Sequence, residues 1–176
     1  MWLGRWAGVD VRHSGSGNIG ATNVARTVGA RPALVTLIVD IAKGVVPTVL
    51  ARAVLADERA VALVGLSAFF GHIFSVFLRF SGGKGVATGF GVFLGLAPLS
   101  AGMALLVFTV VAFSTRYVSA ASMSAAATLP LACAAFGYPS ATSSAAVVVA
   151  VVIIMRHRQN LSRLLDGEES KFQVRS

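Results

Sequence analysis

The sequence predicts an all-α protein: a polytopic bundle of about six transmembrane helices, several of them short, whose polar loops carry the functional motifs. Of its 176 residues, 56% are hydrophobic and only 12% are charged, which is too apolar for an ordinary soluble domain. Three stretches, Ala60–Leu78, Gly85–Thr115 and Tyr117–Met155, contain no Asp, Glu, Lys or Arg. Because ~20 residues cross a bilayer as a helix, each stretch is long enough for one or two crossings. The single cysteine, Cys133, excludes an internal disulfide and a Cys-rich metal site.

The individual helices follow from breaks in these apolar runs. The charged loop Asp57-Glu58-Arg59 separates the first two helices. A single helix over Gly85–Thr115 would be ~46 Å long, more than the ~30 Å of hydrocarbon, and Pro98 lies near its middle, so we expect two helices there. Gly137-Tyr138-Pro139 divides the last stretch in the same way. The expected helices are Pro32–Ala56, Ala60–Leu78, 86–97, 99–114, 118–137 and 140–155.

The basic residues predict which side of the membrane each loop occupies. Six crossings put both termini on one side, and the polar segments of that side carry 12 of the 15 basic residues. This asymmetry is the positive-inside pattern, which makes that side cytoplasmic. The net charge of +8 therefore indicates topology, and no nucleic-acid partner is expected because no basic-aromatic platform accompanies it. The cytoplasmic segments are 1–31, 79–85, 115–117 and 156–176.

The first polar segment has the composition of a phosphate cradle. Closely spaced glycines let backbone N–H groups converge on one ligand, short polar side chains add hydrogen bonds, and an arginine supplies charge. The alternative is a flexible loop that ends in an Asn or Thr helix cap. The candidate ligand-binding residues are Ser16, Gly17, Asn18, Thr22, Asn23 and Arg26.

A second anion site is predicted at Gly82-Gly83-Lys84-Gly85, where a helix is expected to begin near Val86. A glycine turn at a helix start brings free N–H groups, the positive end of the helix dipole and one lysine together. The Walker spacing is absent, so nucleotide hydrolysis is not indicated. A tight interhelical turn with a snorkelling lysine is the alternative.

Three further groups of polar residues lie near the expected cytoplasmic side. Asp40 and Lys43, three positions apart within a span, form either part of the site or a structural ion pair. Arg116 precedes Ser119 and Ser122, which share one helix face but are equally typical of small packing residues. After the last span, His157 and Asn160 have helical spacing, within a basic tail that also fixes topology.

Together and in this order, these segments resemble the bacterial membrane glycerol-3-phosphate acyltransferases that use acyl-phosphate as donor. The resemblance runs from Val9 to Glu169, and five spaced motifs carry it. They are GSGNIGATNVAR (15–26), D-x-x-K-G (40–44), GH (71–72) with F-x-GGKGVAT (80–88), RY-x-S-x-x-S (116–122) and RHR-x-N-x-x-R-L-x-x-G-x-E (156–169).

The resemblance implies transfer of a fatty acyl group from acyl-phosphate to the 1-hydroxyl of sn-glycerol 3-phosphate, the first step of phospholipid synthesis. Ser16, Arg26, His157 and Asn160 then match positions needed for activity, Lys84 one tied to phosphate binding, and Glu169, with Asp40, a structural position. It implies one multi-pass domain over 1–176 in the bacterial cell membrane, completed by the cytoplasmic segment 156–176. Its partners would be the two substrates, membrane lipid and the enzyme that forms acyl-phosphate; no cofactor and no metal is implied.

An acyl-phosphate is already activated, so positioning and charge neutralisation suffice for transfer. The His-x4-Asp pair of other glycerolipid acyltransferases is absent, since Asn18, Phe77 and Ser162 stand five residues after the three histidines. We expect direct attack by the glycerol hydroxyl, with Asn160 or backbone N–H groups supporting the carbonyl oxygen.

Two departures from the family pattern and two rival functions accompany this interpretation. Family members usually have one more apolar helix before the first motif, where only Met1 to Gly8 stand here, and often a proline where Ser75 stands. No cleavable signal peptide is expected, because Arg5 breaks the short apolar start. The rivals are a non-catalytic or degenerate paralogue that binds or transports anions, and an acyltransferase that uses acyl-CoA.

Overall fold

The computed structural model describes residues 8–172, and within them the ordered elements are helices. An apolar chain must satisfy every backbone polar group internally when it lies in lipid, and helices do so. The elements are α2 (Ala21–Thr27), α3 (Ala30–Val54), α4 (Glu58–Ile73), the 3₁₀ turn η1 (Val76–Leu78), α5 (Val86–Leu96), α6 (Pro98–Thr115), α7 (Val118–Ala135), α8 (Ser140–Arg156) and α9 (Arg158–Leu165).

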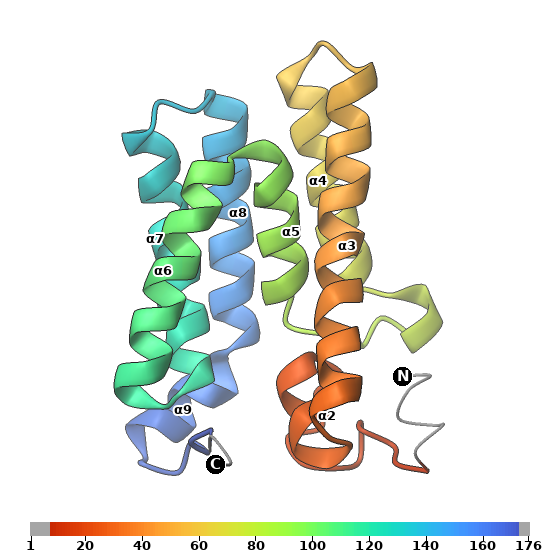
Figure 1. Ribbon diagram of the computed structural model, residues 1–176, viewed down its shortest axis with the longest axis vertical. Helices are drawn as coiled ribbons and strands as arrows, with labels where there is room; N and C mark the ends of the chain where they lie inside the picture. Colours follow the sequence, from red (N-terminus) through yellow and green to blue (C-terminus); the bar gives the residue numbers. More distant parts are fainter. Residues whose placement is uncertain (1–7, 173–176) are drawn as a thin grey trace.

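The expected six-helix bundle is confirmed, because α3 to α8 run alternately up and down while α2 and α9 lie at the same end (Figure 1). Within residues 8–172, four segments are long and apolar enough to cross a membrane alone: α3, Glu58–Leu78, α6 and α7. The pair α8 and α9 qualifies as one span bent by 56°. With 11 residues, α5 is only ~16 Å long, which is about half the hydrocarbon thickness.

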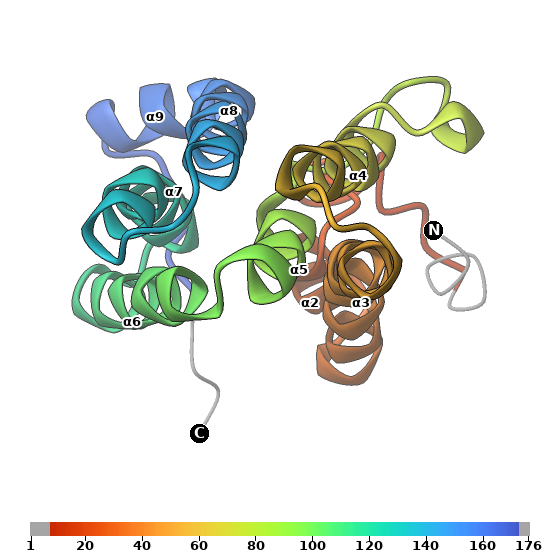
Figure 2. The same ribbon diagram turned by 90° about the horizontal axis from the view of Figure 1, so that it is seen from above.

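The short α5 determines where the glycine turn lies. Seen from above, α5 occupies the middle of the bundle, with α3 and α4 on one side and α6, α7 and α8 on the other (Figure 2). Its N-terminal end lies above the level of α2 and α9 in Figure 1. The turn that precedes α5 therefore enters the bundle instead of running across its end.

The C-terminal part of the second helix differs from the prediction of Ala60–Leu78. α4 ends at Ile73, five residues before the expected Leu78, and η1 follows. The reason is a reversal of the chain: Arg79 and Phe80 adopt positive φ values of 49° and 63°, and Gly82 N–H donates to the Ile73 carbonyl at 3.0 Å. This reversal carries the glycine turn back toward the bundle.

Glycines allow α3 and α5 to pack backbone to backbone. A Cβ at Gly44 would meet the carbonyl of Thr88, and one at Gly91 would meet the carbonyl of Ile41. At its far end, α5 is held by Arg52, whose guanidinium donates to the Leu96 carbonyl at 3.2 Å. Both contacts fix the position of α5, and with it the glycine turn.

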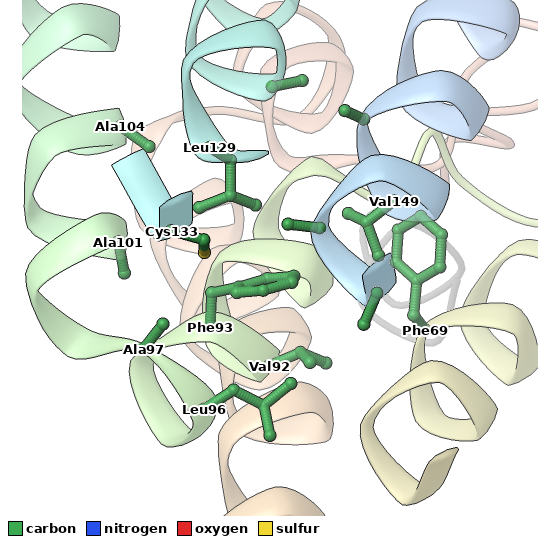
Figure 3. Close-up of a cluster of buried hydrophobic side chains, with 14 of the residues drawn as sticks. Phe69, Val92, Phe93, Leu96, Ala97, Ala101, Ala104, Leu129, Cys133 and Val149 are labelled. Carbon is green, nitrogen blue, oxygen red and sulfur yellow. The ribbon is translucent and has the colours of Figure 1, made fainter. Parts of the chain in front are cut away.

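The hydrophobic core surrounds α5. Phe69, Ile73, Phe93 and Leu96 are fully buried, and Val149 of α8 packs in the same cluster (Figure 3). This core joins the half of the molecule made by α3 and α4 to the half made by α6, α7 and α8. The expectations about a further helix and a signal peptide concern the chain before Gly8, which lies outside the described residues.

Candidate active site

A cavity of ≈ 440 Å³ lies inside the bundle and brings several of the sequence motifs together. Its polar end is formed by the loop before α2, the glycine turn and α9. Its apolar end is formed by α5, α6, α7 and α8. The polar lining includes Ser16, Asn18, Thr22, Asn23, Arg26, Asp40, His72, Lys84, Ser119, Ser122, His157, Asn160 and Glu169.

The first motif is a folded loop organised by Asn23, which is almost fully buried. Its Nδ2 lies 2.9 Å from the Val11 carbonyl, 3.0 Å from that of Ser14 and 2.8 Å from that of Asn18. Its Oδ1 accepts from Ser16 N–H at 2.9 Å. These four contacts of one buried amide argue against a flexible loop, because they tie the segments before α2 together.

Arg26 extends from α2 toward the C-terminal segment. One guanidinium nitrogen donates to the Ser170 carbonyl at 3.1 Å, and the side chain also lines the cavity. Gly20 is the N-cap of α2, and no side chain caps the helix, so the alternative of an Asn or Thr cap is wrong. The remaining guanidinium donors are available to a ligand in the cavity.

The glycine turn is clamped from both sides. Arg156 of α8 donates to the carbonyls of Gly82 and Gly83 at 3.0 and 3.3 Å. A Cβ at Gly82 would meet the backbone carbonyl of His72, and a Cβ at Gly83 would meet the His72 ring. Only glycine fits at either position, so both shape the turn while neither lines the cavity.

Arg156 binds the carbonyls of the turn, which leaves its N–H groups free. From Gly83 to Thr88, no backbone N–H group has a hydrogen-bond acceptor within residues 8–172. These groups include the first turn of α5, where the helix dipole is positive. The arrangement is that of an anion site, with backbone donors and a helix N-terminus at one point.

Lys84 places a cation beside these donors. Its Nζ donates to Oδ1 of Asn160 on α9. Burial lowers the pKa of the Lys84 ammonium to about 8, although Glu169 partly opposes this. The side chain is therefore charged at neutral pH and incompletely solvated, which strengthens its attraction for an anion.

The C-terminal segment completes the polar end. Asn160 Nδ2 donates to Glu169 Oε1 at 2.6 Å, and Arg163 Nε donates to Glu169 Oε2 at 2.8 Å. Burial raises the pKa of Glu169, but the hydrogen bonds it accepts outweigh burial and the net pKa is below the ordinary value. Phe172 N–H donates to the Arg116 carbonyl at 2.9 Å, which attaches the segment to the loop between α6 and α7.

His157 lies at the bend between α8 and α9. It is buried, and its Nδ1 lies 2.7 Å from the Ile153 carbonyl. The predicted helical spacing of His157 and Asn160 is interrupted by this bend, yet both line the same cavity.

Asp40 lies beside two basic side chains on the wall of the cavity. Lys43 Nζ lies 2.8 Å from Asp40 Oδ1, and His72 Nδ1 lies 3.6 Å from the same oxygen. Asp40 and His72 line the cavity, whereas Lys43 does not and is about half exposed. Lys43 therefore fits the alternative of a structural ion pair with Asp40, and the His72 ring lies next to the same carboxylate.

Most predicted site residues meet at the cavity, and the exceptions have physical reasons. Gly17, Gly82 and Gly83 shape loops, Lys43 pairs with Asp40, and Arg116 ends α6 with a positive φ of 63°. His72, Arg156 and Arg163 are site residues that we did not predict. The GH pair beside the glycine motif is the sequence signal for His72, whereas the two arginines have no signal in the sequence beyond that of topology-fixing charges.

The described residues contain no group of three or more His, Cys, Asp or Glu side chains that could hold a metal ion. At the polar end, Arg26, Lys84 and the backbone N–H groups left unpaired within residues 8–172 suit anionic ligands, while the Glu169 carboxylate is paired with Asn160 and Arg163. The apolar end suits a hydrocarbon chain. One cavity can therefore hold a molecule with an anionic head and an alkyl tail.

Comparison with known proteins agrees with this arrangement. The family described as "Glycerol-3-phosphate acyltransferase" matches residues 1–167. The glycerol-3-phosphate acyltransferase of Trichlorobacter lovleyi is 50% identical over 99% of this chain and 90% of its own length. That of Geotalea daltonii is 47% identical over 98% of this chain and 89% of its own length.

The fold is also similar to the crystal structure of PlsY (YgiH), an integral membrane glycerol 3-phosphate acyltransferase, in its glycerol 3-phosphate form. The TM-score is 0.92 at 38% sequence identity, and the match covers 98% of this chain and 88% of that chain. Its lysophosphatidic acid form gives 0.90 at the same identity, with 98% and 86% covered. Agreement in sequence, in fold and in the chemistry of the cavity leads to one conclusion: the chain belongs to the glycerol-3-phosphate acyltransferase family and is an integral membrane enzyme that acylates glycerol 3-phosphate.

Proposed function

We propose that this enzyme takes its acyl group from acyl-phosphate, transfers it to the 1-hydroxyl of sn-glycerol 3-phosphate, and does so at a site that faces the cytoplasm. The observation that carries the proposal is the clamped glycine turn. Lys84 to Ala87 line the polar end of a largely apolar cavity, and their backbone N–H groups have no acceptor within residues 8–172. Lysophosphatidic acid and inorganic phosphate are the products.

Two phosphorylated substrates need more than one cationic site. The glycine turn with Lys84 is the first, and Arg26 beside the loop of Ser16 is the second. Both line one cavity, so two phosphate groups bound there would bring the hydroxyl and the acyl carbonyl close together. Such positioning supplies much of the rate enhancement for an already activated donor.

The side chains favour direct transfer over an acyl-enzyme. Ser122 Oγ donates to the Val118 carbonyl at 2.8 Å, and His157 Nδ1 lies 2.7 Å from the Ile153 carbonyl. Neither forms the serine–histidine pair that activates a nucleophile.

For Asn160 we propose a positioning role in place of direct support of the carbonyl oxygen. Its amide already bonds Lys84 and Glu169, so it holds the lysine in place.

In the proposed step, the glycerol oxygen attacks the acyl carbonyl carbon and forms the ester bond. The bond between that carbon and the bridging phosphate oxygen breaks, and phosphate leaves. The hydroxyl proton ends on the departing phosphate, so atoms and charge balance. Lys84 and the N–H groups of the turn stabilise the negative charge that develops.

The membrane orientation follows from the charges around the polar end. α2 and α9 lie at that end (Figure 1), and segments 1–31 and 156–176 hold nine of the 15 basic residues. By the positive-inside rule this end faces the cytoplasm, where acyl-phosphate would be supplied by the enzyme that forms it. A reporter that works only in the cytoplasm should be active when it is fused after Ser176. Activity of a fused reporter that works only outside the cytoplasm would overturn this orientation.

The same proposal treats 1–176 as one domain whose segment 156–176 completes the site. The bonds from Asn160 and Arg163 to Glu169, and from Arg26 to Ser170, support it. The bond from Arg26 joins the C-terminal segment to the first motif, and the bonds from Lys84 to Asn160 and from Arg156 to Gly82 join it to the glycine turn.

A donor exchange tests the reaction. Purified protein in nanodiscs receives glycerol 3-phosphate with either palmitoyl-phosphate or palmitoyl-CoA. We expect lysophosphatidic acid and an equimolar release of phosphate with the first donor, and no product with the second. Glycerol in place of glycerol 3-phosphate is the matched acceptor control and should not react. Turnover with palmitoyl-CoA alone would overturn the assignment of the donor.

A further inference from the structure

Buried side chains form the floor of the apolar part of the cavity. Phe93 of α5 and Leu129 of α7 line this deep end and are 0% and 5% exposed. Leu96 and Cys133 lie in the same buried core but do not line the cavity. In Figure 3, the Leu129 side chain points toward the Phe93 ring, and Cys133 lies beside that ring.

The open volume above this floor exists because facing walls are built from alanine. Ala101 and Ala104 of α6 and Ala125 and Ala126 of α7 are all at most 9% exposed, and all line the cavity. Protein interiors are otherwise filled to crystal-like density, so the small alanine side chains leave room for part of the ≈ 440 Å³ cavity. A largely apolar space of this size accommodates an apolar guest.

The cavity also has a direction. On α7 its lining runs along one helix face from Ser119 through Ser122 and Ala125 to Leu129. Ten residues of helix correspond to ~15 Å. Ser119 lies at the end where Glu169 and Asn160 lie, and Leu129 lies at the floor. A molecule whose anionic group binds at the polar end therefore points its tail at Leu129.

Resting on the proposed function, we infer that Phe93 and Leu129 set the length of acyl chain that the enzyme prefers, and that Ala125 keeps the path to them open. A chain too long for the space must displace buried side chains. A chain too short leaves the floor without contacts. In a hydrophobic pocket, one methylene changes the specificity constant by roughly 10- to 200-fold.

A second route out of the cavity supplies the competing outcome. Leu37 of α3 and Leu105 of α6 also line the cavity, and they are 38% and 49% exposed. A long acyl chain that left between these helices would lie in lipid and would not reach Leu129. Its length would then have little effect on the rate, whatever stood at the floor.

The test measures kcat/KM over a series of saturated acyl donors of increasing length. Leu129→Ala deepens the cavity, so its optimum should move to longer chains. Ala125→Leu fills the path, so long chains should lose roughly tenfold or more relative to short ones. Leu131→Ala and Ala127→Leu are the matched controls, because these residues lie on the same helix and are exposed. Both controls should keep the wild-type profile.

Opposite shifts in Leu129→Ala and Ala125→Leu, with unchanged controls, establish the floor as the length determinant. Profiles that match those of the controls would overturn the inference and favour exit between Leu37 and Leu105. Thermal unfolding of each variant identifies a folding defect, and either variant alone suffices if the other does not fold. Wild-type inactivity with acyl-phosphates would instead contradict the proposed donor, and the profile would then be measured with the donor that the wild type uses.

Discussion

Lys84 on the glycine turn donates a hydrogen bond to Asn160 on α9, a residue 76 positions away in the sequence. The same amide donates to Glu169 at 2.6 Å, and Arg163 donates to the other carboxylate oxygen at 2.8 Å. A lysine, an amide, a carboxylate and an arginine thus form one connected network. The cation of the anion site is therefore positioned by the C-terminal segment.

Removing either cation should severely reduce acyl transfer. Lys84→Ala and Arg26→Ala each delete a charge that lines the cavity. We expect each to lose ~2–4 kcal/mol of transition-state stabilisation, which lowers kcat/KM roughly 30- to 1,000-fold. Arg158→Ala removes an exposed arginine of α9 that does not line the cavity, and it should retain wild-type rates. Near-normal turnover of purified Lys84→Ala or Arg26→Ala would assign these residues to the turn or to topology alone.

The alkaline limb of the activity profile should reflect Lys84. Because burial lowers its pKa to about 8, the ammonium is charged below that pH and loses its proton above it. The substrate phosphates, with a second pKa of about 6, are already ionised there. We expect kcat/KM, which reports the free enzyme, to fall as pH rises through about 8.

Lys84→Arg provides the control for this assignment, because a guanidinium stays charged throughout the range. Whatever its absolute rate, its kcat/KM should not decline near pH 8, the value expected for Lys84. An unchanged alkaline limb in Lys84→Arg would assign the titration to another group.

Helix positions could be predicted from the sequence because the chain is apolar enough for its breaks to be visible. Pro98 and Pro139 mark the two divisions, and α6 and α8 begin at Pro98 and Ser140. The end of α4 could not be predicted, because Ser75 to Leu78 are compatible with a helix. The reversal depends on positive φ at Arg79 and Phe80, which no residue type there requires.

Arg156 should act by holding the glycine turn. It donates to the carbonyls of Gly82 and Gly83 at 3.0 and 3.3 Å without lining the cavity. Arg156→Ala should raise the KM for a phosphorylated substrate more than it lowers kcat, with kcat/KM reduced roughly 10- to 100-fold. Arg156→Lys retains a charge and N–H donors but lacks the reach and the planar shape of the guanidinium, so partial rescue is expected. A loss in kcat/KM that came entirely from kcat, with KM unchanged, would show a purely structural role.

The site was predictable where motifs carry their own chemistry and not where function depends on contacts between distant segments. The cluster of Ser16, Arg26 and Lys84 could be identified from glycine-rich sequence. Arg156 and Arg163 resemble any basic tail until the fold places them against Gly82 and Glu169. Lys43 shows the reverse case, since its spacing to Asp40 is real but its ammonium lies outside the cavity.

The crossing of α3 and α5 should not tolerate a methyl group. A Cβ at Gly91 would meet the Ile41 carbonyl, so Gly91→Ala should destabilise the protein by ~1–3 kcal/mol and lower its Tm. Gly102→Ala is the matched control, because nothing lies within 4 Å of its Cβ position, and alanine is the better helix former. Differential scanning fluorimetry of the two variants tests this. Equal Tm values would show that the helices separate without cost.

The C-terminal segment should detach as pH falls, because Glu169 must be ionised to hold it. Its net pKa lies below the ordinary value of 4.5, so the stability it contributes is complete above that pH and is lost as pH falls through the lower value in the folded protein. Phe172 N–H, which donates to the Arg116 carbonyl, reports attachment through its protection from hydrogen exchange. Protection should decrease below pH 4.5 in the wild type and in Glu168→Gln, whose residue is exposed, and should be low and independent of pH in Glu169→Gln. Protection that stayed constant in the wild type, or fell equally in Glu169→Gln, would show that another group fastens the segment.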